Sequence, residues 1–158
     1  FLAASKAKMF TEKELEALKA SGVDVFSDPD LTPLLNGEFE RLTLLETAFS
    51  TQEAARFLSV STGRLRQRVM EGTISAMKAR DGKSWAFPSW QFHNRGELPG
   101  LSVVMKAIPD DLNAVDTYSF FTTPQAELED ANGEEMRPID FLLKGGDPSV
   151  VAELGSYL

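Results

Sequence analysis

The chain has 158 residues, of which 42% are hydrophobic and 25% are charged, and its formal net charge at pH 7 is -8. This length fits one domain, or two small domains that share an interface, and the composition is typical of a globular protein rather than a disordered one. No apolar run approaches the ~18–20 residues that a bilayer span needs, so we expect no membrane partner. The absence of cysteine excludes disulfides and thiolate metal sites. The lack of cysteine fits a cytoplasmic protein, which we therefore expect.

The charge is unevenly distributed along the chain. Residues 51–92 contain seven basic and three acidic side chains, which gives +4 there and leaves -12 for the remainder. Because affinity for phosphate comes from clustered Lys and Arg, the negative total argues against indiscriminate nucleic-acid binding. The distribution indicates instead a DNA-facing segment joined to acidic parts. The basic residues of this segment are Arg56, Arg64, Arg66, Arg68, Lys78, Arg80 and Lys83.

Residues 1–49 are predicted to form an N-terminal helical segment. Thr11 and Glu14 match a capping box, and a helix starting there would stop at Gly22. Residues 23–37, rich in Pro and Asp, are expected to form a loop, and residues 38–49 carry apolar side chains at helical spacing. Packing against a neighbouring element explains this apolar stripe, and a dimer interface is the alternative.

Residues 50–95 are predicted to form a winged helix-turn-helix. The expected first helix spans residues 50–58, the turn residues 59–61, and the second helix residues 62–71, with Ser61 as its N-cap and Gly72 as its stop. Residues 74–87 are expected to fold as a hairpin, because Asp81 and Gly82 are a strong turn signal. The side chains spaced to bury the two helices against each other are Ala54, Ala55, Leu58, Val60, Leu65, Val69 and Ile74.

The second helix is predicted to read DNA. At ~100° per residue, Leu65 and Val69 point inward, whereas Gly63 and Gln67 point outward with Arg64 and Arg66 beside them. Arg pairs with guanine edges and Gln with adenine, and a glycine permits close approach to a groove. Arg68 lies nearer the core edge and is assigned to a phosphate. The complete predicted DNA-binding set is Thr62, Gly63, Arg64, Arg66, Gln67, Arg68, Arg80 and Lys83.

Residues 53–74, followed by the run from Lys83 to Pro88, resemble the excisionase/MerR-type winged helix. The matching residues include Glu53-Ala54-Ala55, Leu58-Ser59-Val60-Ser61, Arg68-Val69, Glu71-Gly72-Thr73-Ile74 and Lys83-Ser84-Trp85-Ala86-Phe87-Pro88. The resemblance implies that the second helix enters the major groove and that the wing touches the DNA backbone. A winged helix that binds protein instead of DNA is the alternative.

Residues 96–158 are predicted to form a helical bundle after a polar joint over residues 91–100. One helix is expected from Leu101 to a stop at Pro109, and another, capped by Asp110 or Asp111, runs to a stop at residues 122–124. After an acidic segment with an Asn132-Gly133 turn, Pro138 is expected to start a third helix. Asp147 and Pro148 are predicted to open the last one.

This C-terminal order resembles the toxin-binding domain of the MbcA/ParS/Xre antitoxins. The residues that carry the resemblance are Phe120-Phe121-Thr122-Thr123-Pro124, Gly133, Arg137-Pro138-Ile139-Asp140-Phe141-Leu142, Gly145-Gly146-Asp147 and Val150-Val151. Members of this family block RES-domain toxins, which consume NAD, and many repress their own operon. The resemblance therefore implies a cognate RES-domain-like toxin as partner. The partner-binding residues that it implies are Pro138, Gly146, Asp147, Ser156, Tyr157 and Leu158.

No motif indicates an enzyme. The sequence has no Gly-rich phosphate loop and no nucleophile elbow, and with a single histidine, His93, we expect no metal site, cofactor or catalytic residue. We therefore expect a mainly α protein with a small β-hairpin wing, acting as a dimeric DNA-binding transcriptional regulator of antitoxin type on double-stranded DNA. The alternative is a protein-interaction adaptor whose winged helix does not bind DNA.

Overall fold

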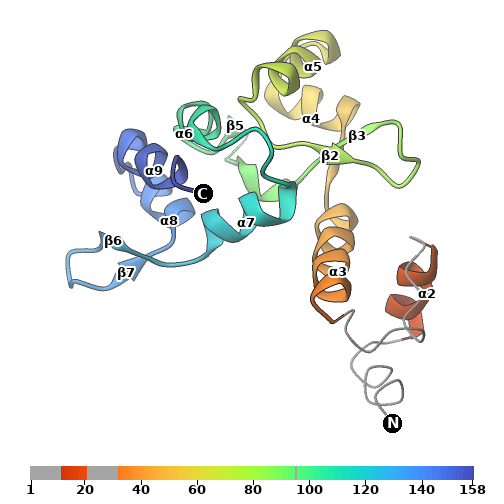
Figure 1. The fold of residues 1–158 in the computed structure, drawn as a ribbon. Coiled ribbons are helices and arrows are strands. Elements are labelled where there is room, and N and C mark those ends of the chain that lie inside the picture. Colours follow the sequence, from red (N-terminus) through yellow and green to blue (C-terminus); the bar gives the residue numbers. More distant parts are fainter. Residues whose placement is uncertain (1–11, 21–31, 95) are drawn as a thin grey trace. The chain divides into compact units, whose positions relative to one another are not determined.

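The computed structural model describes residues 12–20, 32–94 and 96–158, and the chain divides into two compact units, Phe1–Glu46 and Thr47–Leu158. The protein is mainly α-helical with small antiparallel sheets, as expected (Figure 1). The boundary between the two units lies after Glu46, whereas the expected first segment ended at residue 49. The expected segments 50–95 and 96–158 fall within one compact unit. In the part of the chain described, no helix has the length and apolarity to span a bilayer.

The first unit contains helices α2 (Glu12–Ala20) and α3 (Thr32–Glu46), which contact each other. Helix α3 begins earlier than expected, so the predicted loop is wrong for residues 32–37. Pro33 lies in the first turn of α3, where its missing N–H costs no hydrogen bond. The proposed cap Thr11 and stop Gly22 lie outside the described residues.

The second unit opens with two short helices, α4 (Thr51–Leu58) and α5 (Thr62–Glu71), which contact each other. The hydroxyl of Ser50 accepts the N–H of Glu53 at 3.1 Å, and that of Ser61 accepts the N–H of Arg64 at 3.0 Å, so both helices start at capping serines. Both end in left-handed residues, Ser59 at φ 55° and Gly72 at φ 70°. The sequence prediction is confirmed for these helices and for the turn between them.

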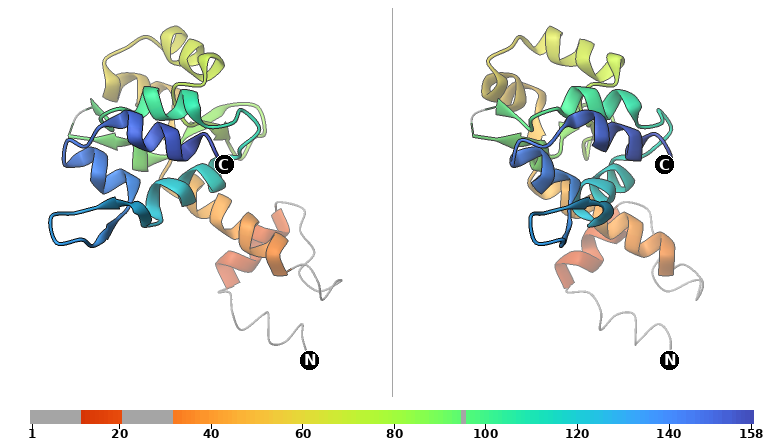
Figure 2. Two further views of the ribbon diagram at one scale, coloured as in Figure 1. Left: turned by 60° about the vertical axis from the view of Figure 1, so that its left-hand side comes forward. Right: turned by 90° about the vertical axis from the view of Figure 1, so that its left-hand side faces the viewer.

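A three-stranded antiparallel sheet packs beside these helices, in the order β1 (Phe49–Ser50), β3 (Trp85–Phe87), β2 (Met77–Lys78). Phe49 pairs with Phe87, and Lys78 pairs with Trp85. The hairpin β2–β3 is shorter than the predicted span of residues 74–87, and β1 was not expected. Because residue 49 belongs to a strand, α3 ends at Glu46 instead of continuing to it. Figure 2 shows the hairpin beside α4 and α5 in two further views.

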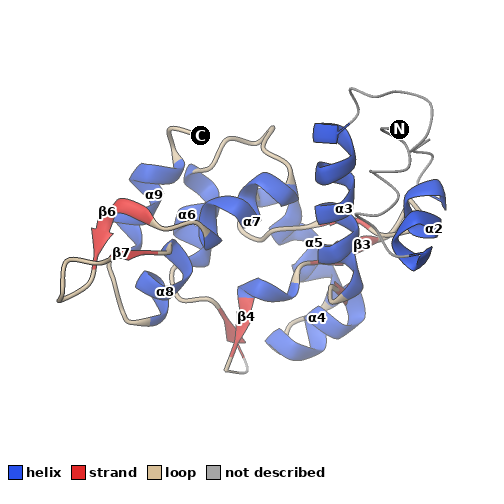
Figure 3. Ribbon diagram, turned by 90° about the horizontal axis from the view of Figure 1, so that it is seen from below, coloured by secondary structure: helices blue, strands red, loops and turns tan. Residues whose placement is uncertain are grey.

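Several residues of the segment after β3 are buried, namely Trp90, Gln91, Phe92 and Leu98, which corrects the expectation of a polar joint over residues 91–100. The segment comprises a short 3₁₀ helix, η1 (Ser89–Gln91), and the two-stranded sheet of β4 (Phe92–His93) and β5 (Gly96–Glu97), visible in Figure 3. The Gln91 side chain is fully buried, accepts the N–H of Ser75 at 2.9 Å and donates to the carbonyls of Ser75 and Pro88. A buried amide with its donors and acceptor satisfied fixes its neighbours in one arrangement.

The C-terminal part contains α6 (Leu101–Ala107), α7 (Ala114–Thr122), α8 (Pro138–Leu143) and α9 (Pro148–Gly155). These helices match the predicted ones, with one correction at the start of α7. Its cap is Asn113, which accepts the N–H of Asp116 at 2.8 Å, rather than Asp110 or Asp111. The acidic segment before α8 is a hairpin, β6 (Gln125–Glu129) with β7 (Glu135–Met136), and the predicted Asn132-Gly133 turn lies between its strands.

Helices α6 and α9 lie side by side and run in the same direction (Figures 1 and 2). A Cβ added at Gly100, before α6, would overlap Pro148 at the start of α9. At the other end, a Cβ at Gly155 would lie 3.1 Å from Ile108. The two helices approach this closely because both positions lack a side chain.

Aromatic rings join the successive segments of the second unit. The rings of Phe49 and Phe92 stack at 4.9 Å between centroids, and Phe57 of α4 packs against both. Trp90 lies 4.5 Å from Phe121 of α7. The hairpin region and the C-terminal helices are therefore packed into one core.

Candidate nucleic-acid interface

Helix α5 has one buried face and one exposed face. Leu65 is fully buried, whereas Gly63, Arg64, Arg66 and Gln67 are exposed. Thr62, the first residue of the helix, is half-buried. The predicted outward set is thus presented together on one helix, with the exception of Arg68.

Arg64 is already engaged on the helix surface. Its Nη1 lies 3.2 Å from Oε1 of Glu71, seven residues further along the helix, and both side chains are exposed. An exposed ion pair of this kind contributes at most about 1 kcal/mol to stability. Arg64 can therefore exchange the Glu71 carboxylate for another anion. Arg66 and Gln67 make no side-chain hydrogen bond to any described residue. Their donors and acceptors are available to an external partner.

Gly63 leaves a gap in this exposed face. A Cβ placed there would meet only the Ser61 hydroxyl, at 3.9 Å, so internal packing does not require a glycine. Glycine near a helix start costs up to ~1 kcal/mol relative to alanine. The residue therefore lowers helix stability and leaves the backbone open to close approach from outside.

Arg68 is turned inward, which corrects its assignment to a DNA phosphate. Its Nη1 and Nη2 donate to the carboxylate of Glu97 in β5 at 3.0 and 2.7 Å, and Nε donates to the Thr73 hydroxyl at 3.0 Å. Nη2 also contacts the Thr73 carbonyl and the Ser102 hydroxyl of α6, each at 3.0 Å. With its guanidinium buried in this network, Arg68 anchors α5 and is not part of an exposed surface.

The turn between β2 and β3 is held by its own aspartate. The Asp81 carboxylate accepts the N–H groups of Lys83 and Ser84 at 2.8 Å each and the Ser84 hydroxyl at 2.6 Å. The Ser84 hydroxyl, followed by these two backbone N–H groups, lowers the pKa of Asp81 from 3.8 to about 2. Gly82 supplies the positive φ, 70°, that the turn requires. Arg80 and Lys83 are consequently exposed on a defined turn rather than on a disordered one.

Lys78 adds a positive charge next to this turn. Its Nζ lies 3.9 Å from the centroid of the Trp85 ring, on the neighbouring strand. Such a contact, worth about 0.5–1 kcal/mol at an exposed site, holds the ammonium over the hairpin. The described hairpin therefore presents Lys78, Arg80 and Lys83 together.

The predicted partner-binding residues fall into two groups. Pro138 is buried at the start of α8, and a Cβ at Gly146 would overlap the Phe141 ring, so these two have packing roles and Pro138 is not available to a partner. Asp147 caps α9 by accepting the Ser149 N–H at 2.9 Å, which lowers its pKa. Ser156, Tyr157 and Leu158 are exposed at the end of the chain, Tyr157 with 81% of its surface.

Sequence reasoning missed two residues that shape this region. Glu97 and Gln91 are polar residues in a stretch that resembled a linker, and only the flanking Trp90, Phe92 and Leu98 hinted at burial. Asp81 was predicted as a turn residue. That its carboxylate accepts hydrogen bonds from residues 83 and 84 was not predicted and is seen only in the structure.

Comparison with known proteins identifies a fold and no family. No protein-family model and no curated protein matches the chain. The structure is similar to the NMR structure of Rv2175c, with a TM-score of 0.50 and 19% sequence identity, over 70% of this chain and 80% of that one. At this identity the likeness shows a shared fold.

We expect the Asp81 carboxyl carbon to titrate with a midpoint near pH 2 when followed by NMR. Because the folded-state pKa is lowered, the turn hydrogen bonds are complete above the ordinary pKa of 3.8 and are lost as the pH falls through about 2. In Ser84→Ala the midpoint should move upward, since the largest cause of the shift is removed. A wild-type midpoint at the ordinary value would contradict the described turn.

Proposed function

We propose that residues 50–95 are a winged helix-turn-helix and that the protein is a DNA-binding transcriptional regulator of antitoxin type. In this proposal α5 enters the major groove of double-stranded DNA and the β2–β3 turn contacts the phosphate backbone. The observation that carries the proposal is the exposed face of α5, where Gly63, Arg66 and Gln67 lie and where the Arg66 and Gln67 side chains make no hydrogen bond to any described residue.

The chemistry of this face suits base recognition. A planar guanidinium and an amide can each make two parallel hydrogen bonds to a purine edge, worth about 1–3 kcal/mol of discrimination. Arg66 and Gln67 are adjacent in sequence and both exposed. Because Arg68 and the capping Ser61 hold α5 against the unit, these side chains start from a fixed helix.

The hairpin supplies the sequence-independent part of the proposed contact. Its three exposed cations, Lys78, Arg80 and Lys83, lie on a turn with defined geometry. Phosphate contacts fix the position of a protein on a duplex, and they make affinity dependent on salt. The net charge of -8 then restricts tight binding to duplexes that also satisfy α5.

We further propose that the C-terminal part binds and neutralises a RES-domain-like toxin, that the protein represses the operon encoding it, and that it acts as a homodimer. Support for the toxin partner comes from the exposed C-terminal residues, above all Tyr157 and Leu158, which form an apolar surface on an otherwise acidic part. Large aromatic side chains are common anchors of protein interfaces. A dimer would meet a palindromic operator with two copies of α5.

The DNA proposal predicts distinct effects for helix and hairpin variants. With a duplex selected from a random pool by the wild type, Arg66→Ala and Gln67→Ala should each lose about 1–3 kcal/mol at one base pair and relax specificity there. Lys83→Ala should weaken binding to all duplexes alike and reduce the slope of log affinity against log salt by about 1. These constants can be measured by fluorescence anisotropy at several salt concentrations.

Lys144→Ala is the matched control. It removes an exposed positive charge at the end of α8, which is not part of the β2–β3 hairpin. It should leave the affinity within about twofold of the wild type, as expected when only long-range, screened charge changes. Equal and weak binding of every duplex by the wild type and all variants would support the alternative, a protein-interaction adaptor that does not bind DNA.

The toxin proposal predicts that Tyr157→Ala weakens the complex with a RES-domain toxin encoded beside this protein. Loss of an exposed aromatic anchor should cost about 2 kcal/mol, close to thirtyfold in affinity, without changing the melting temperature. Met70→Ala, an exposed apolar change on α5, serves as control. Calorimetry that shows no complex, or equal affinities for both variants, would contradict this part.

A further inference from the structure

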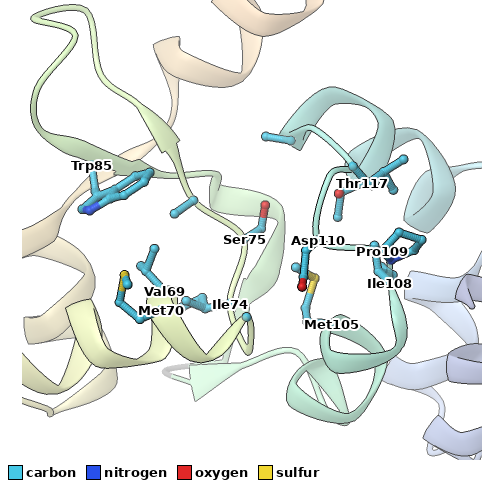
Figure 4. A pocket seen from close by; sticks show the side chains of 14 residues that line it. Val69, Met70, Ile74, Ser75, Trp85, Met105, Ile108, Pro109, Asp110 and Thr117 are labelled. Carbon is cyan, nitrogen blue, oxygen red and sulfur yellow. The ribbon is translucent and has the colours of Figure 1, made fainter.

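A groove of ≈ 360 Å³ separates the helix and hairpin side of the second unit from its C-terminal helices. One wall consists of the end of α5 and the segment leading into β2, with Val69, Ile74 and Ser75; Trp85 of β3 contributes to the same side. The opposite wall is formed by α6, the segment that connects it to α7, and α7 itself, and it includes Met105 and Asp110. Figure 4 shows these side chains facing one another across the groove.

The walls combine apolar side chains with polar atoms, among them those of Ser75, Asp110 and Thr117. Val69, Ile74, Met105, Ile108 and Leu112 provide aliphatic and thioether surface. Methionine side chains adapt to the shape of what they contact, and Met70, also on this groove, is 85% exposed. The volume lies within the ~300–1,000 Å³ of small-molecule sites.

The groove has one charge, and it is negative. Among the described residues that line it, Asp110 is the charged one, and its carboxylate forms no ion pair with another described residue. A Cβ added at Gly72 would lie 3.9 Å from Oδ1 of Asp110, which places this carboxylate at the C-terminal end of α5. That end of a helix is itself partially negative. Asp110 is exposed, so this negative charge lies at the open side of the groove, where an external cation can reach it.

Ser75 supplies a buried hydroxyl in the same space. The residue is 4% exposed, and its backbone N–H and carbonyl are satisfied by Gln91. The side-chain oxygen has no hydrogen-bond partner among the described residues, and Figure 4 shows it in the space between the two walls. A hydroxyl that reaches the groove without an internal partner can accept a hydrogen bond from a ligand donor.

We propose that this groove binds a small organic ammonium ion that carries an apolar or aromatic body. The ammonium donates to the Asp110 carboxylate and the Ser75 hydroxyl, and the body packs against Val69, Met105 and Trp85. Because its walls come from α5 and the hairpin on one side and from α6 and α7 on the other, an occupant bridges the two halves of the unit. The binding site does not depend on the proposed function in DNA recognition.

The test uses 2-phenylethylammonium and its neutral analogue of the same shape, 2-phenylethanol, titrated into the full chain and followed by ¹H–¹⁵N NMR. The amine should bind with a Kd of about 1 mM, in keeping with a ligand of few atoms, and shift the Ser75 amide and the Trp85 indole signals. The alcohol should bind at least tenfold more weakly, since it lacks the charge.

Two neighbouring carboxylates provide a matched pair of variants. Asp110→Asn should weaken amine binding about tenfold, whereas Asp111→Asn, an exposed change outside the groove, should leave it unchanged. Ser75→Ala should weaken it about two- to tenfold. The amide spectra of all variants report whether the fold is intact.

Three results would each overturn the proposal. One is equal affinity for the amine and the alcohol, and another is equal affinity of the Asp110 and Asp111 variants. The third is the absence of saturable shifts at Ser75 and Trp85 at about ten times the expected Kd. Since no step uses DNA, failure here leaves the DNA proposal standing, and failure of DNA binding leaves this one standing.

Discussion

The inward orientation of Arg68 decides what α5 can present to the outside. Its guanidinium has five N–H donors in a rigid fork, and here they meet the Glu97 carboxylate, both oxygen atoms of Thr73 and the Ser102 hydroxyl. These partners belong to the end of α5, to β5 and to α6, so one side chain ties the helix to segments that follow it by about thirty residues. With this side anchored, the opposite side of α5 faces solvent.

The exposed chemistry of the unit follows from this arrangement and from local hydrogen bonds. Gly63, Arg66 and Gln67 lie opposite the anchored side, and Asp81 organises the turn that presents Arg80 and Lys83. The acidic residues are concentrated elsewhere, several of them on the β6–β7 hairpin. The separation of charge that the sequence indicated is therefore realised as a basic helix and hairpin in an acidic protein. The proposals about DNA and about an organic cation use different parts of α5, its exposed face and its C-terminal end.

How far the sequence could predict this structure depends on how local each signal is. Ser61, Gly72 and Asp147 act on residues close to them in sequence, and the helix boundaries that they indicated were correct. Strand β1 has two residues and pairs with β3 far along the chain, so no local pattern announces it. The direction of Arg68 could not be derived either, because helical spacing placed it at the border of the buried face. Only the position of Glu97 in space resolves that ambiguity.

The central claim is that Arg68 faces inward and Arg66 outward, and the free energy of unfolding of matched variants tests it most directly. Arg68→Met should lower that free energy by about 2–3 kcal/mol in urea, because Glu97 and Ser102 lose their partner. Arg66→Met should change it by less than about 0.5 kcal/mol, as expected for an exposed side chain. Equal losses, or a larger loss for Arg66→Met, would contradict the account.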